Sequence, residues 1–283
     1  MGKLRWMSDA WDTAFGAARA AGVELRALTT LEDAEAISGI MIATWGEHQL
    51  LPREMIVALA HSGNEPYGAF DGDRMIGYVL GWAGVDPQDG LHLHSHMLAA
   101  LPDRRHRGVG FALKLAQRAQ CLEQGIRTVR WTFDPLVSRN AWFNMGKLGA
   151  AADRFHRDFY GAMGDELNEG ERSDRFMVRW DLEREPGPRS LGGEAPTVLQ
   201  RGGDPAAPVP ELVAPAGPAG GWVEIPREYA EVRASDPELG GAWRDASADT
   251  VEALMAAGCV AAAFDRERSA YRFVPASDVE VPA

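Results

Sequence analysis

Cysteine and long apolar runs are both scarce in this sequence. It has two cysteines, Cys121 and Cys259, and no C-x-x-C pair, which excludes a disulfide framework and favours a reducing compartment. No apolar run approaches the ~20 residues that a helix needs to span a bilayer. Asp9 and Asp12 interrupt the first residues, so we expect no signal peptide. These absences predict a cytoplasmic protein that does not enter a membrane.

Basic residues are also in the minority. The sequence has 29 lysines and arginines against 41 aspartates and glutamates, so its formal net charge is −12. A chain of this charge repels the phosphate backbone, which argues against DNA or RNA as a partner. The same charge argues against docking on an anionic lipid surface. A small-molecule partner fits the composition better.

The composition divides the chain into four parts. Residues 1–22 have the pattern of an N-terminal helix, and residues 23–185 carry strand and helix patterns. Residues 186–221 are dominated by Gly, Pro and Ala and bury little apolar surface, which predicts a flexible linker. Residues 222–283 regain strand and helix patterns, but so small a module is seldom stable by itself. We expect it to pack on the first domain or on a second subunit.

Cap and turn signals set the order of elements in residues 23–185. Thr30 followed by Asp33 resembles a capping box, and Asp71-Gly72-Asp73 is a hairpin signal. The expected strands are 23–28, 67–70, 75–82, 91–99, 128–133 and 176–182, and the expected helices are 30–45, 52–61, 108–124 and 138–148. This mixture predicts an α+β fold.

The sharpest local feature is the loop Arg104-Arg105-His106-Arg107-Gly108-Val109-Gly110, between an expected strand and an expected helix. A helix N-terminus offers unpaired backbone N–H groups and the positive end of the helix dipole. Glycines let the backbone approach a phosphate, and arginines add positive charge. The loop is not a Walker A motif, because no Gly-Lys-Ser/Thr follows. It therefore indicates a pyrophosphate site, with a basic turn before a surface helix as the alternative.

The run R-x-x-G-x-G, made by Arg105, Gly108 and Gly110, resembles the acyl-CoA motif of the GNAT superfamily. The element order of residues 23–182 is similar to that fold. Further segments resemble one bacterial family of GNAT-related acetyltransferases associated with N-acylation of amino acids: SHML (95–98), WTFDPL (131–136), NAWFN (140–144), KLGA (147–150) and SDRF (173–176). The resemblance implies a mixed, mainly antiparallel sheet flanked by helices, with a small C-terminal α/β appendage.

The resemblance also implies roles for individual residues. Backbone N–H groups from Arg105 to Gly110 would hold the CoA pyrophosphate, and strand 91–99 would part from strand 128–133 to leave a wedge where thioester and amine meet. Many members carry a tyrosine that protonates the leaving thiolate where this chain has Met145, which has no such proton to donate. The expected CoA-binding residues are Met97, Leu98, Arg105, His106, Arg107, Gly108, Val109 and Gly110.

Three histidines, His92, His94 and His96, alternate along the expected strand 91–99 and so face one side. The outer two are about 13 Å apart along the strand, so one Zn²⁺ with bonds of about 2 Å cannot bind all three. We therefore expect no metal. Two interpretations stay open: a polar strand face, or His96 as the catalytic base in the wedge.

Residues downstream supply candidates for the acceptor site. Asx residues between a strand and a helix also cap and turn, and tryptophans also line cores, so a structural role is the alternative. An arginine after Asp174 either pairs with that aspartate or meets a substrate carboxylate. The expected substrate-binding residues are Trp131, Asp134, Asn140, Asn144 and Arg175.

These features together predict an acyl-CoA-dependent N-acyltransferase. It would move an acetyl or succinyl-type group from acetyl-CoA or succinyl-CoA to the amine of a small molecule, with an amino acid as the expected acceptor. Attack would be direct, because Cys121 lies within a helix pattern and implies no nucleophile. The alternative is a GNAT-like module that binds acyl-CoA without turnover, as a sensor or scaffold. A protein acetyltransferase also stays open, and the sequence allows a homodimer.

Overall fold

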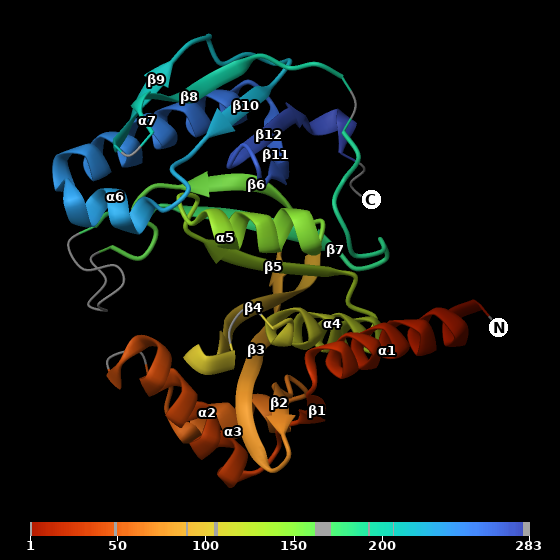
Figure 1. Cartoon of the computed structure of the whole chain (residues 1–283). Helices are drawn as coiled ribbons and strands as arrows, with labels where there is room; N and C mark the ends of the chain where they lie inside the picture. Colours follow the sequence, from red (N-terminus) through yellow and green to blue (C-terminus); the bar gives the residue numbers. More distant parts are fainter. Residues whose placement is uncertain are drawn as a thin grey trace. The chain divides into compact units, whose positions relative to one another are not determined.

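The computed structural model describes residues 2–47, 50–88, 90–104, 107–161, 171–191, 193–205 and 207–279. These residues form two compact units (Figure 1). The first unit contains the described residues up to Trp131 together with Glu171, and the second contains residues 132–161 and 172–279. None of the described helices is long and apolar enough to cross a bilayer.

The first unit is a sheet with helices on both faces. Its strands lie in the order β1-β2-β3-β4-β5, antiparallel except for the parallel pair β4 and β5. The fold is therefore the mixed, helix-flanked α+β arrangement that the sequence predicts. The elements are α1 (Gly2–Ala21), β1 (Glu24–Ala27), α2 (Leu31–Trp45), α3 (Arg53–His61), β2 (Tyr67–Asp71), β3 (Arg74–Asp86), β4 (Gly90–Ala100), η2 (Pro102–Arg104), α4 (Val109–Glu123) and β5 (Thr128–Phe133), whose last two residues belong to the second unit.

Helices α2 and α3 begin at the capping residues that the sequence predicts. The Thr30 side chain accepts a hydrogen bond from the Asp33 backbone, and the Asp33 carboxylate accepts one from Thr30 N at 2.9 Å. This capping box satisfies backbone donors that the first turn of α2 leaves unpaired. Pro52 immediately precedes α3, where the missing N–H costs nothing.

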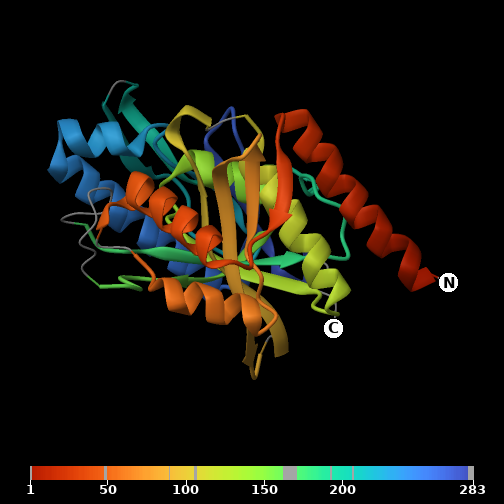
Figure 2. The same cartoon turned by 90° about the horizontal axis from the view of Figure 1, so that it is seen from below.

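Two separate cores lie on the two faces of the first sheet. On one face, α2 and α3 contribute Ile37 and Ile56 to a core with Tyr78 and Leu80. On the other, α1 and α4 pack against strand residues such as Ile76 (Figure 2). Each helix pair thus buries one apolar stripe against the sheet, which is what orients α4 on β3 and β4.

A β-bulge in β3 points two consecutive residues, Ile76 and Gly77, toward the same core. Ala69 pairs with Gly77 and Phe70 with Met75, so Ile76 is extra in the ladder. A Cβ on Gly77 would lie 2.8 Å from the Ala99 carbonyl oxygen of β4, and 3.2 and 3.3 Å from side-chain atoms of Val109 and Leu113 of α4. The glycine therefore allows α4 to approach the sheet closely.

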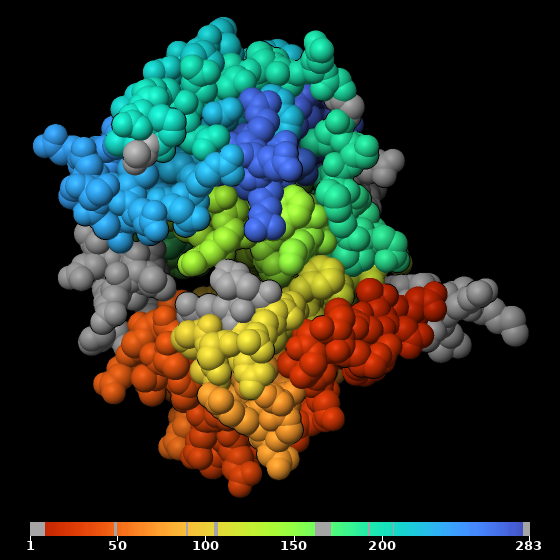
Figure 3. All heavy atoms as spheres, viewed as in Figure 1, coloured from red at the N-terminus to blue at the C-terminus, as the bar shows by residue number. Residues whose placement is uncertain are grey.

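The N-terminal helix lies along α4. Trp11 Nε1 donates a hydrogen bond to the Glu123 carboxylate at 2.7 Å, and the Trp11 ring lies 5.4 Å from that of Tyr67. In the space-filling view, α1 (red) lies against the yellow segment that includes the start of α4 (Figure 3). This contact makes α1 part of the first unit, rather than a separate helix before it.

The second unit is built on a second run of paired strands. Their order is β7-β6-β11-β12-β10-β8-β9, and the neighbours are antiparallel except for the parallel pair β10 and β8. Phe176 lies at the centre of its core, with ring contacts to Phe133, Phe155 and Tyr271. The elements are α5 (Ser138–Ala141), η3 (Trp142–Lys147), β6 (Ala151–His156), β7 (Arg175–Asp181), β8 (Thr197–Asp204), β9 (Ala207–Leu212), β10 (Gly221–Glu224), α6 (Tyr229–Ser235), α7 (Pro237–Ala256), β11 (Cys259–Asp265), β12 (Ala270–Pro275) and η4 (Ala276–Asp278).

The flexible linker predicted over residues 186–221 is wrong for residues 197–204 and 207–212. They form the hairpin of β8 and β9, in which Val198 and Leu199 are almost fully buried. Pro208 and Pro210 are tolerated within the hairpin because they lie on β9, the last strand in the order, where a missing N–H does not break an inner ladder. Pro208 also accepts a hydrogen bond from Trp243 Nε1 at 2.6 Å.

The predicted domain limits also differ from the two units. A domain over 23–185 and a module over 222–283 would leave β6 and β11 in different domains. The structure instead pairs Ala152 of β6 with Ala261 of β11, so the C-terminal strands complete a unit that begins in β5. Pairing between strands so distant in sequence leaves no local signal.

Candidate active site

The predicted phosphate loop leads into α4 with the geometry that an anion site requires. Gly108 is the N-cap of α4 and has φ +89°, a conformation that favours glycine. The first N–H groups of the helix, starting at Val109, have no intrahelical acceptor and are available to an anion. Arg107 is exposed beside them. Arg105 and His106 lie outside the described residues.

Arg104 of the loop pairs with protein carboxylates. The Arg104 guanidinium forms a short ion pair with the Asp71 carboxylate and lies 3.6 Å from that of Asp103. Arg104 therefore ties the end of β4 to the β2–β3 turn. The positive charge that the described loop leaves to a ligand comes from Arg107 and the helix dipole.

A bulge interrupts β4 next to the loop. Leu80 pairs with Met97 and Gly81 with Ser95, so His96 is extra in the ladder. A Cβ on Gly81 would lie 2.5 Å from the His94 carbonyl oxygen, so the strands can approach this closely only with glycine there. The expected CoA-binding residue Met97 packs on the next position, where its sulfur accepts the Tyr78 hydroxyl at 3.5 Å.

Two of the three strand histidines lie against a tryptophan. The Trp82 ring lies 5.2 Å from that of His94 and 4.8 Å from that of His96. Burial lowers the pKa of His96, and burial with the neighbouring His96, His92 and Lys114 lowers the pKa of His94 to about 4. Both imidazoles are therefore neutral at neutral pH, the state in which a histidine accepts a proton.

Across the described residues, no group of three or more His, Cys, Asp or Glu side chains is arranged to hold a metal ion. His92 Nδ1 lies 3.1 Å from the Gly90 carbonyl oxygen, which fixes that ring at the start of the strand.

A buried lysine that the sequence reading missed lies where β4 and β5 part. In the parallel ladder of these strands, Leu93 pairs with Val129 and His94 with Arg130. The next residues, Ser95 and Trp131, both contact Lys114 of α4. We call Ser95 and Trp131 the parting point. The available signal was Lys114 itself, a lysine amid apolar residues in the run Phe111-Ala112-Leu113-Lys114-Leu115.

Asp134, an expected substrate residue, already has protein partners within the second unit. Arg244 Nη1 and Nη2 donate to its two carboxylate oxygens at 2.8 and 2.9 Å, and Leu136 N donates at 2.8 Å. Arg175 Nη1 lies 3.8 Å away. Asp134 thus forms a bidentate, largely buried ion pair with an arginine 110 residues later in the chain.

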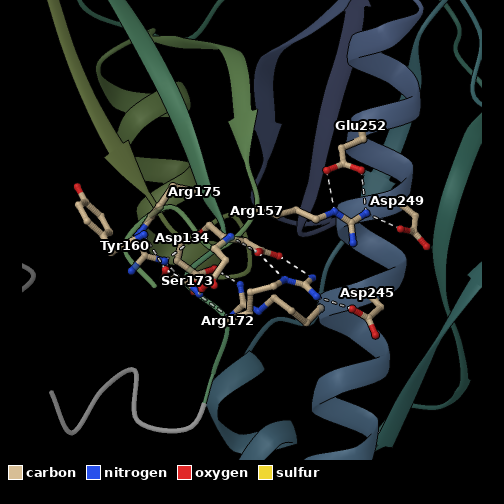
Figure 4. Close-up of polar contacts among 12 residues, drawn as sticks. Asp134, Arg157, Tyr160, Arg172, Ser173, Arg175, Asp245, Asp249 and Glu252 are labelled. Carbon is tan, nitrogen blue, oxygen red and sulfur yellow. Dashed lines mark hydrogen bonds and ion pairs between the residues drawn. The ribbon is translucent and has the colours of Figure 1, made fainter. Parts of the chain in front are cut away.

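Arg175 lies beside Asp134 and Tyr160, as the close-up shows (Figure 4). Its guanidinium is 5.6 Å from the Tyr160 ring centre and donates to the Asp174 carbonyl oxygen at 2.8 Å. The Asp174 carboxylate pairs instead with Arg172, at 2.7 Å. The structure therefore brings the predicted residues Asp134 and Arg175 together, and it gives the bracing ion pair to Arg172.

The remaining predicted residues have different environments. Asn140 is exposed in α5, and Asn144 is buried in the π-helical turn η3, a type of turn frequent at functional sites. Met145 is fully buried in the same turn. Trp131 is buried beneath Lys114, in the first unit. None of these positions by itself assigns a substrate contact.

Residues 26–146 match the model of the acetyltransferase (GNAT) family. These residues form a GNAT acetyltransferase domain. The chain thus carries the domain of an acyl-CoA-dependent N-acyltransferase, over a range that includes the loop at Gly108, the bulge at His96 and the parting point. The narrower family of amino-acid acyltransferases is not shown by this match.

Solved structures of acetyltransferases resemble the chain at low identity. The ribosomal-protein-S18-alanine N-acetyltransferase of Escherichia coli is 14% identical over 60% of this chain and 96% of its own, with a TM-score of 0.44. Naa20 of Chaetomium thermophilum, in complex with a bisubstrate analogue, is 18% identical over 60% and 94%, with a TM-score of 0.46. Likeness at this level carries no information on the substrate of the GNAT domain. No curated protein matched the chain.

The ion pair of Asp134 predicts that replacing this aspartate destabilises the protein much more than replacing Asp245, another aspartate of the second unit. We expect Asp134→Ala to lower the free energy of unfolding by about 3–5 kcal/mol, because it leaves the buried Arg244 without its bidentate partner. Asp245→Ala removes an exposed partner of Arg172 and should cost less than about 1 kcal/mol. Denaturant unfolding of both variants measures the difference. An Asp134→Ala protein as stable as Asp245→Ala would contradict the structural role of Asp134.

Proposed function

We propose that this chain transfers an acyl group from acyl-CoA to the amine of a small molecule that carries a carboxylate, such as an amino acid. The observation that carries the proposal is the junction of β4 and α4 in a GNAT domain, where the bulge at His96 is followed by the helix capped by Gly108. A bulged strand and an anion-binding helix start are the two parts that an acyl-CoA thioester and its pyrophosphate need.

The CoA pyrophosphate fits the start of α4. Backbone N–H groups of Val109 and Gly110 and the exposed Arg107 supply donors there, and the positive φ of Gly108 turns the chain without a side chain in the way. Arg105 and His106 extend this set on sequence grounds. Met97 and Leu98 follow the bulge on β4, in the direction of the loop, and suit the pantetheine arm.

His96 suits the role of base. Its imidazole is neutral at neutral pH because burial lowers its pKa, and it belongs to the bulge itself. The acceptor amine loses a proton as its nitrogen attacks the thioester carbon, the C–S bond breaks, and CoA leaves as a thiolate. Met145 cannot protonate that thiolate. A thiolate is a good leaving group, so the reaction does not require an acid at that position.

The carboxylate on the acceptor is proposed from Arg175. A guanidinium matches a carboxylate in shape and charge, and Arg175 lies among polar groups of the second unit rather than in a fully apolar core. The acyl group is proposed to be acetyl or succinyl.

A thiol-release screen tests the function directly. Acetyl-CoA and succinyl-CoA are each mixed with the protein and with amino acids of both configurations, the corresponding decarboxylated amines, and short peptides. Release of CoA thiol with amino acids, and at least about tenfold less with the decarboxylated amines, is the expected result. Tight acyl-CoA binding without thiol release for any amine would favour a sensor or scaffold. Preference for peptides would favour protein acetylation.

A CoA site at the start of α4 predicts that a carboxylate weakens acyl-CoA binding when it replaces Gly108 before the helix, but not when it replaces Gly125 after the helix. Gly108→Asp places a carboxylate at the start of the helix, and the nearest atom to its Cβ is 3.6 Å away, so we expect the fold to persist. Acyl-CoA binding should weaken by at least about a hundredfold in calorimetry, because a like charge meets the pyrophosphate. Gly125→Asp is the matched control, since Gly125 follows α4, has φ +77° and has open space. Equal affinity for both variants would remove the CoA site from this loop.

The role of His96 predicts a pH-dependent loss of activity. His96→Ala should lower kcat/KM by at least about tenfold at neutral pH and regain part of it at high pH, where more of the amine is unprotonated. Wild-type activity should fall as pH drops through the lowered pKa of His96, and the variant should lack that fall. His92→Ala is the control on the same strand. Wild-type activity of His96→Ala at every pH would place the base elsewhere.

A further inference from the structure

Lys114 is the most unusual charged residue of the GNAT domain. It lies in the middle of α4 with 2% of its surface exposed. Its Nζ donates to Ser95 Oγ at 2.8 Å and to Gln117 Oε1 at 3.1 Å, and it lies 3.9 Å from the centre of the Trp131 ring. Lys114 thus makes two hydrogen bonds and a cation–π contact. The hydrogen bond to Ser95 reaches β4, and the cation–π contact with Trp131 reaches β5.

Stability does not explain a lysine at this position. In the part of the chain that the structure describes, no carboxylate lies within 4 Å of Lys114 Nζ. Its burial lowers the pKa of Lys114 to about 7. A buried ammonium without a counter-charge costs folding free energy that two neutral acceptors and a ring offset only in part, so an apolar side chain of similar size would suit α4 better.

The contacts of Lys114 coincide with the parting point of β4 and β5. The backbone ladder there pairs His94 with Arg130, and the lysine then joins the next two residues, Ser95 and Trp131, through their side chains. The bulge at His96 begins directly after Ser95. The lysine therefore replaces the backbone pairing just where the strand must leave its regular path.

We propose that Lys114 is a positioning residue for acyl transfer: its ammonium links Ser95 to the Trp131 ring at the parting point and thereby holds the bulge at His96 in one conformation. The inference rests on the proposed function, because the bulge matters only if a thioester reacts there. Lys114 acts through Ser95 and does not touch the reacting atoms. A misplacement of about 1 Å at a reacting group can cost about a hundredfold in rate, which is the size of effect that such a link prevents.

Two substitutions on the same face of α4 separate the link from simple packing. Lys114→Met keeps a long unbranched side chain and removes the ammonium. Gln117→Met is the matched control. Gln117 is also buried, and its side chain accepts the other hydrogen bond of Lys114 within α4, so this variant removes that bond and leaves the contact of Lys114 with β4 intact. Ser95→Ala removes the strand end of the link and completes a double-mutant cycle with Lys114→Met.

The first measurement needs no substrate. Hydrogen exchange of the amides of residues 95–98 and 129–131 should quicken by at least about tenfold in Lys114→Met and stay within about threefold of wild type in Gln117→Met. The midpoint of thermal unfolding should stay the same or rise in Lys114→Met, since a buried charge is removed. Unchanged exchange in Lys114→Met would overturn the link.

The second measurement is turnover with the acceptor that the thiol-release screen identifies. Lys114→Met should lower kcat by at least about tenfold with the KM for acyl-CoA within about threefold, and adding Ser95→Ala should lower kcat little further. Equal kcat in Lys114→Met and wild type would overturn the positioning role. If exchange quickens as expected but the wild-type protein releases no thiol with any amine, the proposed function fails while the link between the strands stands.

Discussion

The close approach of β3 and β4 at Gly81 is the constraint on which the first unit depends. Only a residue without a Cβ fits against the His94 carbonyl oxygen, and this contact places the bulge at His96. The bulge then directs Met97 toward the core under α2 and α3, while Ser95 faces α4. The bulge opposite Gly81 thus sends side chains of β4 to two different cores. It also leaves an irregular backbone at His96, where the proposed chemistry occurs.

Burial sets the charge states around that backbone. The histidines at Trp82 are neutral because desolvation disfavours their cations. Desolvation also lowers the pKa of Lys114, to about 7, and its Nζ donates hydrogen bonds to Ser95 and Gln117. A neutral imidazole and a buried amino group therefore lie against opposite faces of β4. In the proposed acyl transfer, His96 is the proton acceptor and the contacts of Lys114 hold β4 in place. No carboxylate of the described residues lies within 4 Å of Lys114 Nζ.

The second unit depends on arginine–carboxylate pairs. Asp134 binds Arg244, Asp174 binds Arg172, and Arg157 binds Asp249 and Glu252 of α7 (Figure 4). Acidic residues that give the chain its net charge thus brace α7 against the segments around β6 and β7. The buried bidentate pair of Asp134 and Arg244 fixes geometry even if it adds little stability, because removing one partner leaves the other uncompensated.

The sequence by itself determined the features that depend on neighbouring residues. The capping box at Thr30, the hairpin at Gly72 and the start of α4 after Gly108 need only local hydrogen bonds and backbone angles, and the α+β order of elements follows from them. Tertiary structure alone decided that residues 197–204 and 207–212 form strands, that Asp134 faces Arg244, and that Lys114 lies between β4 and β5. The reason is physical: each of these depends on a partner far away in the chain, and neither periodicity nor propensity encodes which distant group will satisfy a buried charge or an unpaired strand.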